Sequence, residues 1–507
     1  MVSNTVKLLG VSGSLRNLRH GKGSDILVEE INQIHTREHL IEYLSSQAQI
    51  CLSSFIEAGR KDNKSFDKIL KNLKRLPGVN GLSNSEVLLV AGLWAAKQNN
   101  VEIEHVSLSD IFGNEKNAKE KIYSFLNKIK EANGILVSGP VYFGDRGSLT
   151  HDFLQLLRVN SKLVKDKVFA GITVGAKRNG GQETTLIYQM LDFINIGMLA
   201  VGNDAESTAQ YGGTGHAGDV GDIAKDYYGI NTAIGTGNRI SNVLKMINST
   251  KDTALKKKPK IGIIVLQDKN NKVLNYVKKT IINSYLSKVA DFRLLYLVNE
   301  SIKSCIACDI CPTEVDDDRI YRCIIKSKKD VFSSIHEEMI DFDAILIGGF
   351  SPENYESLKS VYQKFMERTR YLRRSDYLLS NYLVVPLIFK DVNSRENLET
   401  RIITSMIRHH TIIYSPIIFN ELDNRLINFE KAIGDLEQFV EMAKKIAVGR
   451  IKYNATALEY EHYNPVGYTL SSAKDKDFTT IQKRKTAMNK RRVRFKQMLT
   501  RRVIYNG

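Results

Sequence analysis

Residues 7–16 read KLLGVSGSLR, an apolar run that stops abruptly at two serines, a glycine and an arginine. Such a run is typical of a buried strand that ends in a turn. Backbone N–H groups after a parallel strand can also hold a phosphate, because small residues let the main chain approach it. Ser12, Ser14 and Arg16 would add two hydroxyls and a positive charge. Taken alone, the stretch leaves both interpretations open.

Strand-like and helix-like patterns alternate through the first half of the chain. We expect strands at 6–12, 101–108, 134–143, 167–176 and 198–204, separated by helical stretches. This alternation is typical of a doubly wound parallel sheet. Residues from about 20 to 82 interrupt the pattern and read as helices, so we interpret them as a helical insertion over the active site.

A charged stretch at 253–260 is followed by a restart of the same pattern. The second half predicts a helix at 273–286 and strands at 260–267, 291–298, 343–352 and 382–390. The repeated order indicates a tandem duplication rather than short repeats. We therefore expect an α/β protein with two doubly wound parallel sheets, and we place its domains at 1–252, 258–450 and 451–507.

The composition narrows the class of protein. No stretch of the 507 residues approaches the roughly 18 apolar residues that span a bilayer, and the N-terminus does not resemble a signal peptide. We expect a cytoplasmic protein with no membrane partner.

The net charge is +17, but ten cations and no acid lie between Lys483 and Arg502. We expect the segment from Ala473 to be an exposed basic helix or arm, which would dock on acidic surfaces, contact nucleic acid or simply be solvated.

Two further loops follow predicted strands and are rich in small residues, aromatics and hydrogen-bond donors. In a doubly wound sheet, loops at the carboxyl ends of the strands converge on one crevice. These candidate residues are Pro140, Val141, Tyr142, Phe143, Gly144, Gly175, Ala176, Lys177, Arg178, Gly180 and Gly181. A third glycine-rich segment, 202–229, reads either as ordinary turns or as a loop that closes over the site.

Four of the five cysteines lie close together in the second half. Cys305, Cys308 and Cys311 form C-x-x-C-x-x-C, and Cys323 follows after eleven residues. Thiolates at this spacing can hold a 4Fe–4S cluster or structural zinc, and unrelated buried thiols are the third interpretation. Cys51 stands alone and is interpreted as a core residue.

With three loops in this order, the first half resembles the flavodoxin-like NAD(P)H-dependent FMN reductases over residues 5–20 and 83–245. The shared features are a GSxR loop, a PVYF segment and a glycine-rich loop followed by QETT. The resemblance implies that Ser12, Ser14, Leu15 and Arg16 hold the phosphate of FMN. It also implies that residues 140–144 and 175–181 surround the flavin ring.

The second half resembles the iron–sulfur flavoproteins, another flavodoxin-like group. Its cysteine motif follows the second predicted strand and precedes a helix, as in that family, which implies a 4Fe–4S cluster on Cys305, Cys308, Cys311 and Cys323. Its own first loop, VLQDKNNK (265–272), lacks the glycine and serines. We therefore expect the second half to have kept the cluster and lost the flavin.

Together these resemblances imply a flavin-dependent oxidoreductase with FMN, NAD(P)H as electron donor, and electron transfer to or from the cluster. The acceptor would be a small molecule or a redox protein, and the chain would form a homo-oligomer. No catalytic side chain is assigned, because the cofactor carries the redox chemistry. The alternatives are an electron-supplying partner of another enzyme and a nucleic-acid-associated redox enzyme.

Overall fold

The computed structural model describes residues 5–17, 22–73, 81–112, 118–204, 209–308, 323–325, 329–374, 377–456 and 478–505. The chain divides into two compact units, Met1–Lys245 (unit 1) and Met246–Gly507 (unit 2). No helix within these ranges is long and apolar enough to cross a membrane.

Unit 1 is built on a parallel sheet with the strand order β2-β1-β3-β5, after which β5 pairs with both β6 and β7. The strands are β1 (Lys7–Ser12), β2 (Glu102–Ser107), β3 (Gly134–Tyr142), β4 (Asp145–Arg146), β5 (Val168–Gly175), β6 (Leu199–Ala200) and β7 (Gly213–His216). This is the order of the flavodoxin-like doubly wound fold, which confirms the expected fold class. The strand predicted at 198–204 is shorter, since pairing with β5 breaks off after β6 and resumes at β7.

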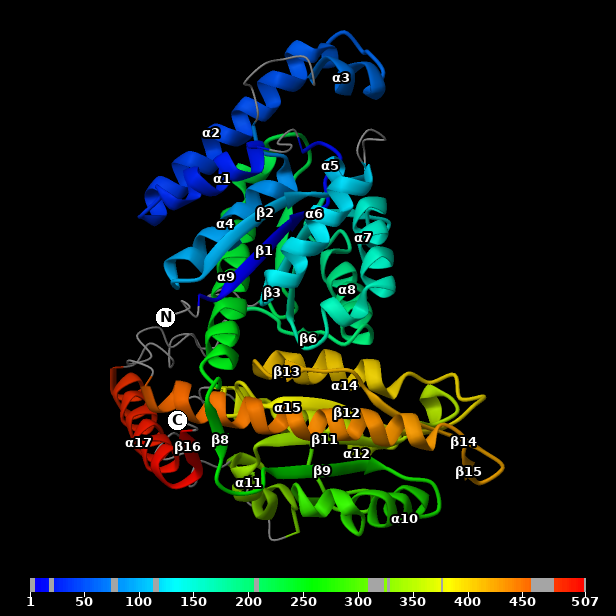
Figure 1. Ribbon diagram of the computed structural model, residues 1–507. Helices are drawn as coiled ribbons and strands as arrows, with labels where there is room; N and C mark the ends of the chain where they lie inside the picture. Colours follow the sequence, from blue (N-terminus) through cyan, green and yellow to red (C-terminus); the bar gives the residue numbers. More distant parts are fainter. Residues whose placement is uncertain are drawn as a thin grey trace. The chain divides into compact units, whose positions relative to one another are not determined.

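Helices cover both faces of this sheet, with α4 and α9 on one face and α6, α7 and α8 on the other (Figure 1). The helices of unit 1 are α1 (Lys22–Asn32), α2 (Arg37–Phe55), η1 (Ile56–Arg60), α3 (Phe66–Leu73), α4 (Asn84–Gln98), α5 (Leu108–Phe112), α6 (Ala118–Glu131), α7 (Ser148–Val159), η2 (Ser161–Leu163), α8 (Gln182–Asn195) and η3 (Asp222–Lys225), and α9 (Tyr227–Asn248) ends in unit 2. Because both faces are covered, the strands are continuous apolar runs rather than alternating ones.

The predicted insertion forms α1, α2, η1 and α3. It explains why α4 is buried on every side from Ser85 to Ala96, since α4 lies between the sheet and the inserted helices. Trp94 Nε1 and Gln98 Nε2 both donate to the Ile34 carbonyl at 3.1 Å. A helix that is apolar all round needs such cover on its outer side.

Unit 2 repeats the architecture, with the strand order β10-β9-β11-β12 and with β13 and β14 both pairing with β12. Its strands are β8 (Thr253–Leu255), β9 (Lys260–Gln267), β10 (Asp291–Tyr296), β11 (Ala344–Phe350), β12 (Leu383–Asp391), β13 (Ile412–Ile413), β14 (Ile417–Leu422), β15 (Arg425–Leu426) and β16 (Val503–Tyr505). Its helices are α10 (Lys272–Val277), η4 (Lys278–Ile282), η5 (Tyr285–Lys288), α11 (Phe332–Asp341), η6 (Tyr355–Ser357), α12 (Ser360–Arg368), α13 (Arg370–Arg374), α14 (Leu398–Met406), η7 (Ile407–His409), α15 (Phe429–Thr456) and α17 (Phe478–Arg502). In both units the fifth position of the sheet is made of two short strands, which is the structural signature of the duplication.

The basic C-terminal segment is helical, as expected, but it is not a free arm. Phe495 of α17 and Val503 of β16 form a small core with Val448, Ile451 and Ala455, the last three from α15. Strand β16 pairs antiparallel with β8. The sequence suggested an arm because cations dominate α17, whereas a few apolar residues on one side are enough to hold it on unit 2.

A buried ion pair fixes the end of α17. Arg502 donates through Nη1 and Nη2 to the two carboxylate oxygens of Asp343 at 3.0 and 2.5 Å. Asp343 is fully buried, and Arg450 Nη2 lies 3.6 Å from it. A buried carboxylate without these partners would be strongly destabilising, so Arg502 belongs to the folded unit.

Candidate functional site

A cavity of about 530 Å³ opens in unit 1 at the carboxyl ends of β1, β3 and β5. The three predicted loops meet there. The predicted residues that line it are Ser14, Leu15, Arg16, Pro140, Val141, Tyr142, Gly175 and Ala176. Its size lies within the range of ordinary ligand pockets, about 300–1,000 Å³.

The loop after β1 packs tightly against the loop after β3. The Gly13 N–H donates to the Ser138 carbonyl at 2.7 Å. A Cβ at Gly13 would lie 2.3 Å from Thr150 Oγ1, so only glycine fits there. Ser14 Oγ accepts the Arg16 N–H at 3.2 Å, which gives the loop its turn.

Several buried hydroxyls beside this loop have no protein partner within the described residues. They are Ser12 Oγ, Ser83 Oγ and Thr150 Oγ1. A buried polar group without a partner is costly, so such hydroxyls mark a place where a polar ligand group fits. Ser83 lines the cavity, directly before α4 begins. This donor set fits the phosphate end of a flavin nucleotide.

The other predicted flavin residues lie outside the cavity lining. Ser12 is buried beneath it, while Phe143 is fully exposed at the turn between β3 and β4 with a φ of 51°. Gly144, Lys177, Arg178, Gly180 and Gly181 belong to the same two loops but do not line the cavity. The structure therefore brings the three predicted loops to one cavity, and only part of each loop lines it.

Arg178 is held away from the cavity by the segment after β7. It pairs with the buried Asp226, donates to His216 Nδ1 at 2.9 Å and lies over the Tyr228 ring at 4.7 Å. His216 lies 3.1 Å from Asp226 through Nδ1. This network holds the glycine-rich loop after β5 in place, and His216 has a structural role in it.

Residues missed by sequence reasoning complete the cavity wall. Cys51 and Phe66 come from the insertion, Asn84 and Ser85 from the start of α4, and 217–220 from the glycine-rich segment. The sequence indicated these residues only indirectly. The insertion and the 202–229 segment were both expected to cover the site, but no single residue in either segment was identified as a candidate. Burial raises the pKa of the Cys51 thiol to about 12, and the nearby Glu86 carboxylate adds to the shift.

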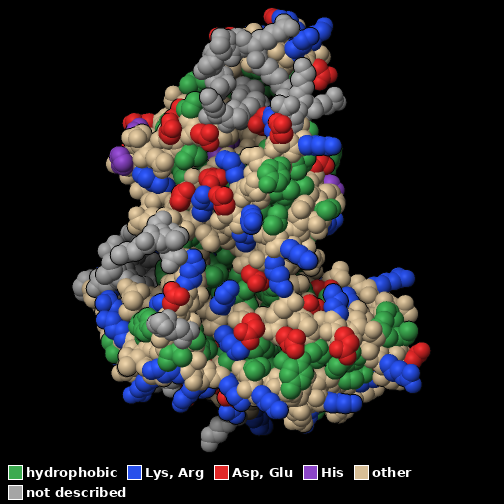
Figure 2. Space-filling view, in the orientation of Figure 1, with side chains coloured by type: hydrophobic (Ala, Val, Ile, Leu, Met, Phe, Trp, Pro, Cys, Tyr) green, Lys and Arg blue, Asp and Glu red, His purple; other side chains and the backbone are tan. Residues whose placement is uncertain are grey.

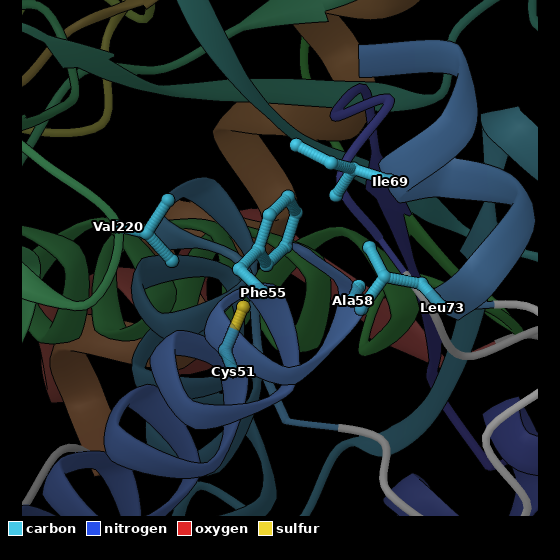
Figure 3. Close-up of a cluster of buried hydrophobic side chains, with 6 residues drawn as sticks. All are labelled: Cys51, Phe55, Ala58, Ile69, Leu73 and Val220. Atoms are coloured by element: carbon cyan, nitrogen blue, oxygen red, sulfur yellow. The ribbon is translucent and has the colours of Figure 1, made fainter. Parts of the chain in front are cut away.

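The insertion is attached to the cavity rim by an apolar cluster and by polar contacts. Figure 3 shows Phe55 surrounded by Cys51, Ala58, Ile69, Leu73 and Val220. Val220 is the member that comes from the segment after β7. Next to it, Asn84 Nδ2 donates to the Asp219 carbonyl, and Asn84 Oδ1 accepts the Gly221 N–H, both at 2.9 Å. The inserted helices thus form one wall of the cavity.

In unit 2, the edge of the sheet at the carboxyl ends of the strands is occupied by side chains of the unit itself. After β9, Asp268 Oδ1 accepts the backbone N–H groups of Lys269 at 2.6 Å and Val273 at 2.9 Å, and Oδ2 accepts that of Leu274 at 3.1 Å. Tyr296 also donates to Oδ2 at 3.1 Å. A carboxylate of the chain itself thereby accepts N–H groups at the place where a phosphate would otherwise bind.

The cysteine segment is only partly described. Cys305, Cys308 and Cys323 are half-buried free thiols, and Cys311 lies outside the described residues. Within the described part of the chain, no group of three or more Cys, His, Asp or Glu side chains is gathered as a metal site. Among the residues that the structure describes, Cys305, Cys308 and Cys323 are therefore not gathered into a metal site.

The two ends of the cysteine segment are nevertheless fixed. Asp330 and Arg368 form a fully buried ion pair at 2.7 Å. Asp330 Oδ1 accepts the Lys303 N–H at 3.2 Å, and Arg368 Nη1 donates to the Lys303 carbonyl at 3.1 Å. The Cys305 N–H donates to Glu367 at 3.3 Å. Residues 303–305 and 330 are thus held together at the base of the segment.

Comparison with known proteins places the fold in a family. Residues 78–211 match the model of the NADPH-dependent FMN reductase family. The iron–sulfur flavoprotein of Methanocaldococcus jannaschii is 36% identical over 179 residues, which is 32% of this chain and 92% of that protein. The iron–sulfur flavoprotein of Methanosarcina thermophila is 33% identical over 131 residues, 25% of this chain and 63% of that protein.

Solved structures also match. A WrbA-like flavodoxin protein of Agrobacterium tumefaciens is 22% identical with a TM-score of 0.23, covering 31% of this chain and 87% of its own. Since this chain spans nearly the whole M. jannaschii protein at 36% identity, it belongs to the iron–sulfur flavoprotein family.

Proposed function

We propose that this flavin oxidoreductase binds one FMN in unit 1, takes electrons from NAD(P)H, and exchanges them with a 4Fe–4S cluster on the 305–323 segment. The observation that carries the proposal is the cavity at the carboxyl edge of the unit 1 sheet, where three loops with flavin-type motifs meet. In open α/β sheets, ligands bind at this edge. The reductase family match over 78–211 includes two of these loops.

The phosphate of FMN would lie on the loop after β1. Ser14 and Arg16 line the cavity there and would supply a hydroxyl and a positive charge. The unpartnered hydroxyl of Ser83, which lines the cavity, would complete its hydrogen bonds with the bound nucleotide. Arg16 is already oriented, because its guanidinium carbon lies 5.9 Å from the centre of the Phe55 ring.

The flavin ring would lie against Pro140, Val141 and Tyr142 on one side and the backbone at Gly175 and Ala176 on the other. FMN supplies a carrier that accepts electrons as a pair and releases them singly or in pairs. The protein's part is to hold the ring, to exclude water and to restrict access. Phe66 and Cys51 of the insertion narrow the cavity and would select which acceptor reaches the ring.

The cluster is proposed from the cysteine spacing together with the fixed base of the segment. Four thiolates in C-x-x-C-x-x-C-x11-C are a donor set that suits 4Fe–4S, and zinc is the alternative. The Asp330–Arg368 pair holds both ends of the segment, so that the thiols have a defined anchor. A one-electron centre is a natural partner for a flavin, which can divide an electron pair.

The test is anaerobic purification followed by visible spectroscopy and iron analysis. Ser14→Asp, which puts a carboxylate beside the phosphate, should remove the flavin absorption, while Ser124→Asp on the exposed side of α6 should keep it. Cys308→Ser should remove iron and leave FMN bound. Retention of flavin by Ser14→Asp would refute the phosphate assignment.

The donor is tested on the same preparation. Addition of NADPH or NADH under anaerobic conditions should bleach the flavin absorption. If neither nucleotide bleaches it while dithionite does, NAD(P)H is not the donor. Zinc in place of iron in the anaerobic protein would refute the electron-transfer part and leave the flavin part standing.

A further inference from the structure

A second cavity, of about 700 Å³, lies in unit 2 near the amino-terminal ends of β9 and β10. It is separate from the cofactor edge of the sheet, which lies at the carboxyl ends of the strands. Its lining residues are Lys256, Lys257, Lys258, Lys260, Ile282, Ser287, Ala290, Asp291, Phe292 and Arg502. Half of them are cations.

Most of this positive charge is not compensated by the protein. Within the described part of the chain, the side chains of the exposed Lys257 and Lys260 have no hydrogen bond or ion pair. Lys256 and Lys258 donate to neutral carbonyl groups, those of Thr500 and Ser287, both at 2.8 Å.

The acids near the cavity do not offset these lysines. Asp291 is the acidic residue of the lining, and its carboxylate lies 3.3 Å from Arg293. The fifth cation, Arg502, is neutralised by the buried Asp343. Among the described residues, four lysines therefore share one concave surface with a single lining acid, Asp291, which already pairs with Arg293. Concave surfaces of one charge concentrate ligands of the opposite charge.

The cationic surface continues outside the cavity along α17. Arg501, beside the cavity residue Arg502, is exposed, and so is Lys496, which lies one helical turn before Thr500. Helix α17 contains no acidic residue. In Figure 2, Lys and Arg side chains gather over the region where Figure 1 shows α17 and β8, with few acidic side chains among them.

We propose that this surface binds single-stranded nucleic acid, independently of the flavin chemistry. Phosphates of the strand would contact Lys256, Lys257, Lys258 and Lys260, and Phe292 with Ile282 would offer apolar surface to a base. Single-strand sites combine a cationic groove with an aromatic side chain in this way. A free nucleotide would pair with the cavity lysines only, whereas a strand would also reach Arg501 and Lys496.

The test uses fluorescence anisotropy of the full holoprotein with labelled 12-residue oligo(U) and oligo(dT) across a series of salt concentrations. Lys257→Gln/Lys260→Gln should weaken binding at least tenfold at low salt. It should also reduce the slope of log K against log salt by about 1.4, since each lost single-strand contact accounts for about 0.7. Neither lysine side chain has a partner among the described residues, so the variant should keep its flavin spectrum.

The matched control is Lys431→Gln/Lys445→Gln, which removes the same charge from exposed positions of α15. It should leave both the affinity and the salt slope nearly unchanged. An equal loss in the two double variants would mean that net charge alone attracts the strand, and the proposal would be wrong. ATP is the third arm: if the 12-mers bind no more tightly than ATP at this site, its ligand is a free nucleotide and the strand proposal is overturned.

Discussion

Arg60 and Asp219 join the inserted helices to the segment that borders the cavity of unit 1, with Arg60 Nη2 lying 2.5 and 2.6 Å from the two carboxylate oxygens of Asp219. Partial burial raises the pKa of Asp219, but hydrogen bonds from Arg60 and from the Val220 N–H outweigh it, so that the pKa lies below its ordinary value. Asp219 also lines the cavity. The pair therefore connects the position of the insertion directly to the shape of the site.

Breaking this pair should loosen the insertion without unfolding the protein. Because the pair is partly exposed, we expect Arg60→Gln to lower the free energy of unfolding by no more than about 1 kcal/mol. We expect faster proteolysis within residues 56–73 and faster loss of FMN on dilution. Lys64→Gln, which removes an exposed pair with Asp62 inside the insertion, is the control and should change neither rate. Unchanged proteolysis in Arg60→Gln would show that the apolar cluster alone holds the insertion.

The ion pair between Arg60 and Asp219 stabilises the folded protein over a defined pH range. The pKa of Asp219 is lower in the folded state than in the unfolded state. The contribution of this carboxylate to the free energy of unfolding is therefore complete above its unfolded pKa of about 3.9, and it is lost as the pH falls through the folded pKa. Proteolysis of the insertion in the wild type should therefore not vary between pH 5 and 8. A change within that interval would point to another titrating group.

The chain should bind one FMN, not two. Asp268 uses both carboxylate oxygens on the backbone N–H groups of Lys269, Val273 and Leu274 after β9, so that these N–H groups are not free for a phosphate. Flavin released by denaturation should amount to one FMN per chain in the wild type and none in Ser14→Asp. Asp268→Ala should leave this ratio at one and lower the stability of unit 2, because each buried N–H that loses its acceptor costs about 1–3 kcal/mol. Two flavins per wild-type chain would contradict this assignment.

His409 should make unit 2 less stable as the pH falls. Burial lowers the pKa of His409 to about 3, and the positive charges of Arg373 and Arg408 add to the shift. The unfolded histidine takes up a proton below about pH 6.5, while the folded one stays neutral. The free energy of unfolding should be flat above pH 6.5 and fall by up to about 1.4 kcal/mol per pH unit below it.

Chemical denaturation of the full chain between pH 4.5 and 8 measures this effect through the transition of unit 2. His409→Gln keeps a group that can bond to Thr369, whose hydroxyl lies 3.1 Å from His409 Nε2, and should flatten the profile. His39→Gln, at an exposed position of α2, should not. An identical pH profile in His409→Gln and the wild type would assign the acid sensitivity to other groups.

The cysteines should differ in reactivity towards alkylating agents. Cys51 is fully buried and its pKa is raised to about 12, so the reactive thiolate is nearly absent at pH 8. In iron-free protein, iodoacetamide should modify Cys305, Cys308 and Cys323 and spare Cys51, as read by mass spectrometry of the peptides. Rapid labelling of Cys51 in the folded protein would mean that the insertion opens readily.

Local sequence patterns predicted most elements of the two sheets, because strands buried on both faces are continuous apolar runs. The strand expected at 260–267 coincides with β9, and the strand expected at 134–143 is one residue longer than β3. The fifth strand was less regular. The strand expected at 198–204 is reduced to Leu199–Ala200, and Gly213–His216, which the glycine-rich sequence did not identify as a strand, becomes one by pairing with β5.

The sequence could predict which loops form the site, but not which residues line the cavity. The sequence identified the three loops because phosphate and flavin contacts need glycines, hydroxyls and aromatics at strand ends. It could not show that Arg178 is drawn towards Asp226, forty-eight residues later, or that Cys51 lines the cavity. Such contacts depend on segments that are distant in the chain.

Taken by itself, the sequence determined the duplicated sheet, the three loops at the strand ends and the cysteine spacing, since each of these depends on neighbours within one strand, turn or motif. The tertiary structure decided which residues face the cavity, how the insertion is fastened by Arg60 and Asp219, and that Asp268 takes the anion-binding N–H groups of unit 2. It also packed the basic helix on α15. The physical reason is that the burial of a side chain and the partner of a charged group depend on which distant segments of the chain pack around them.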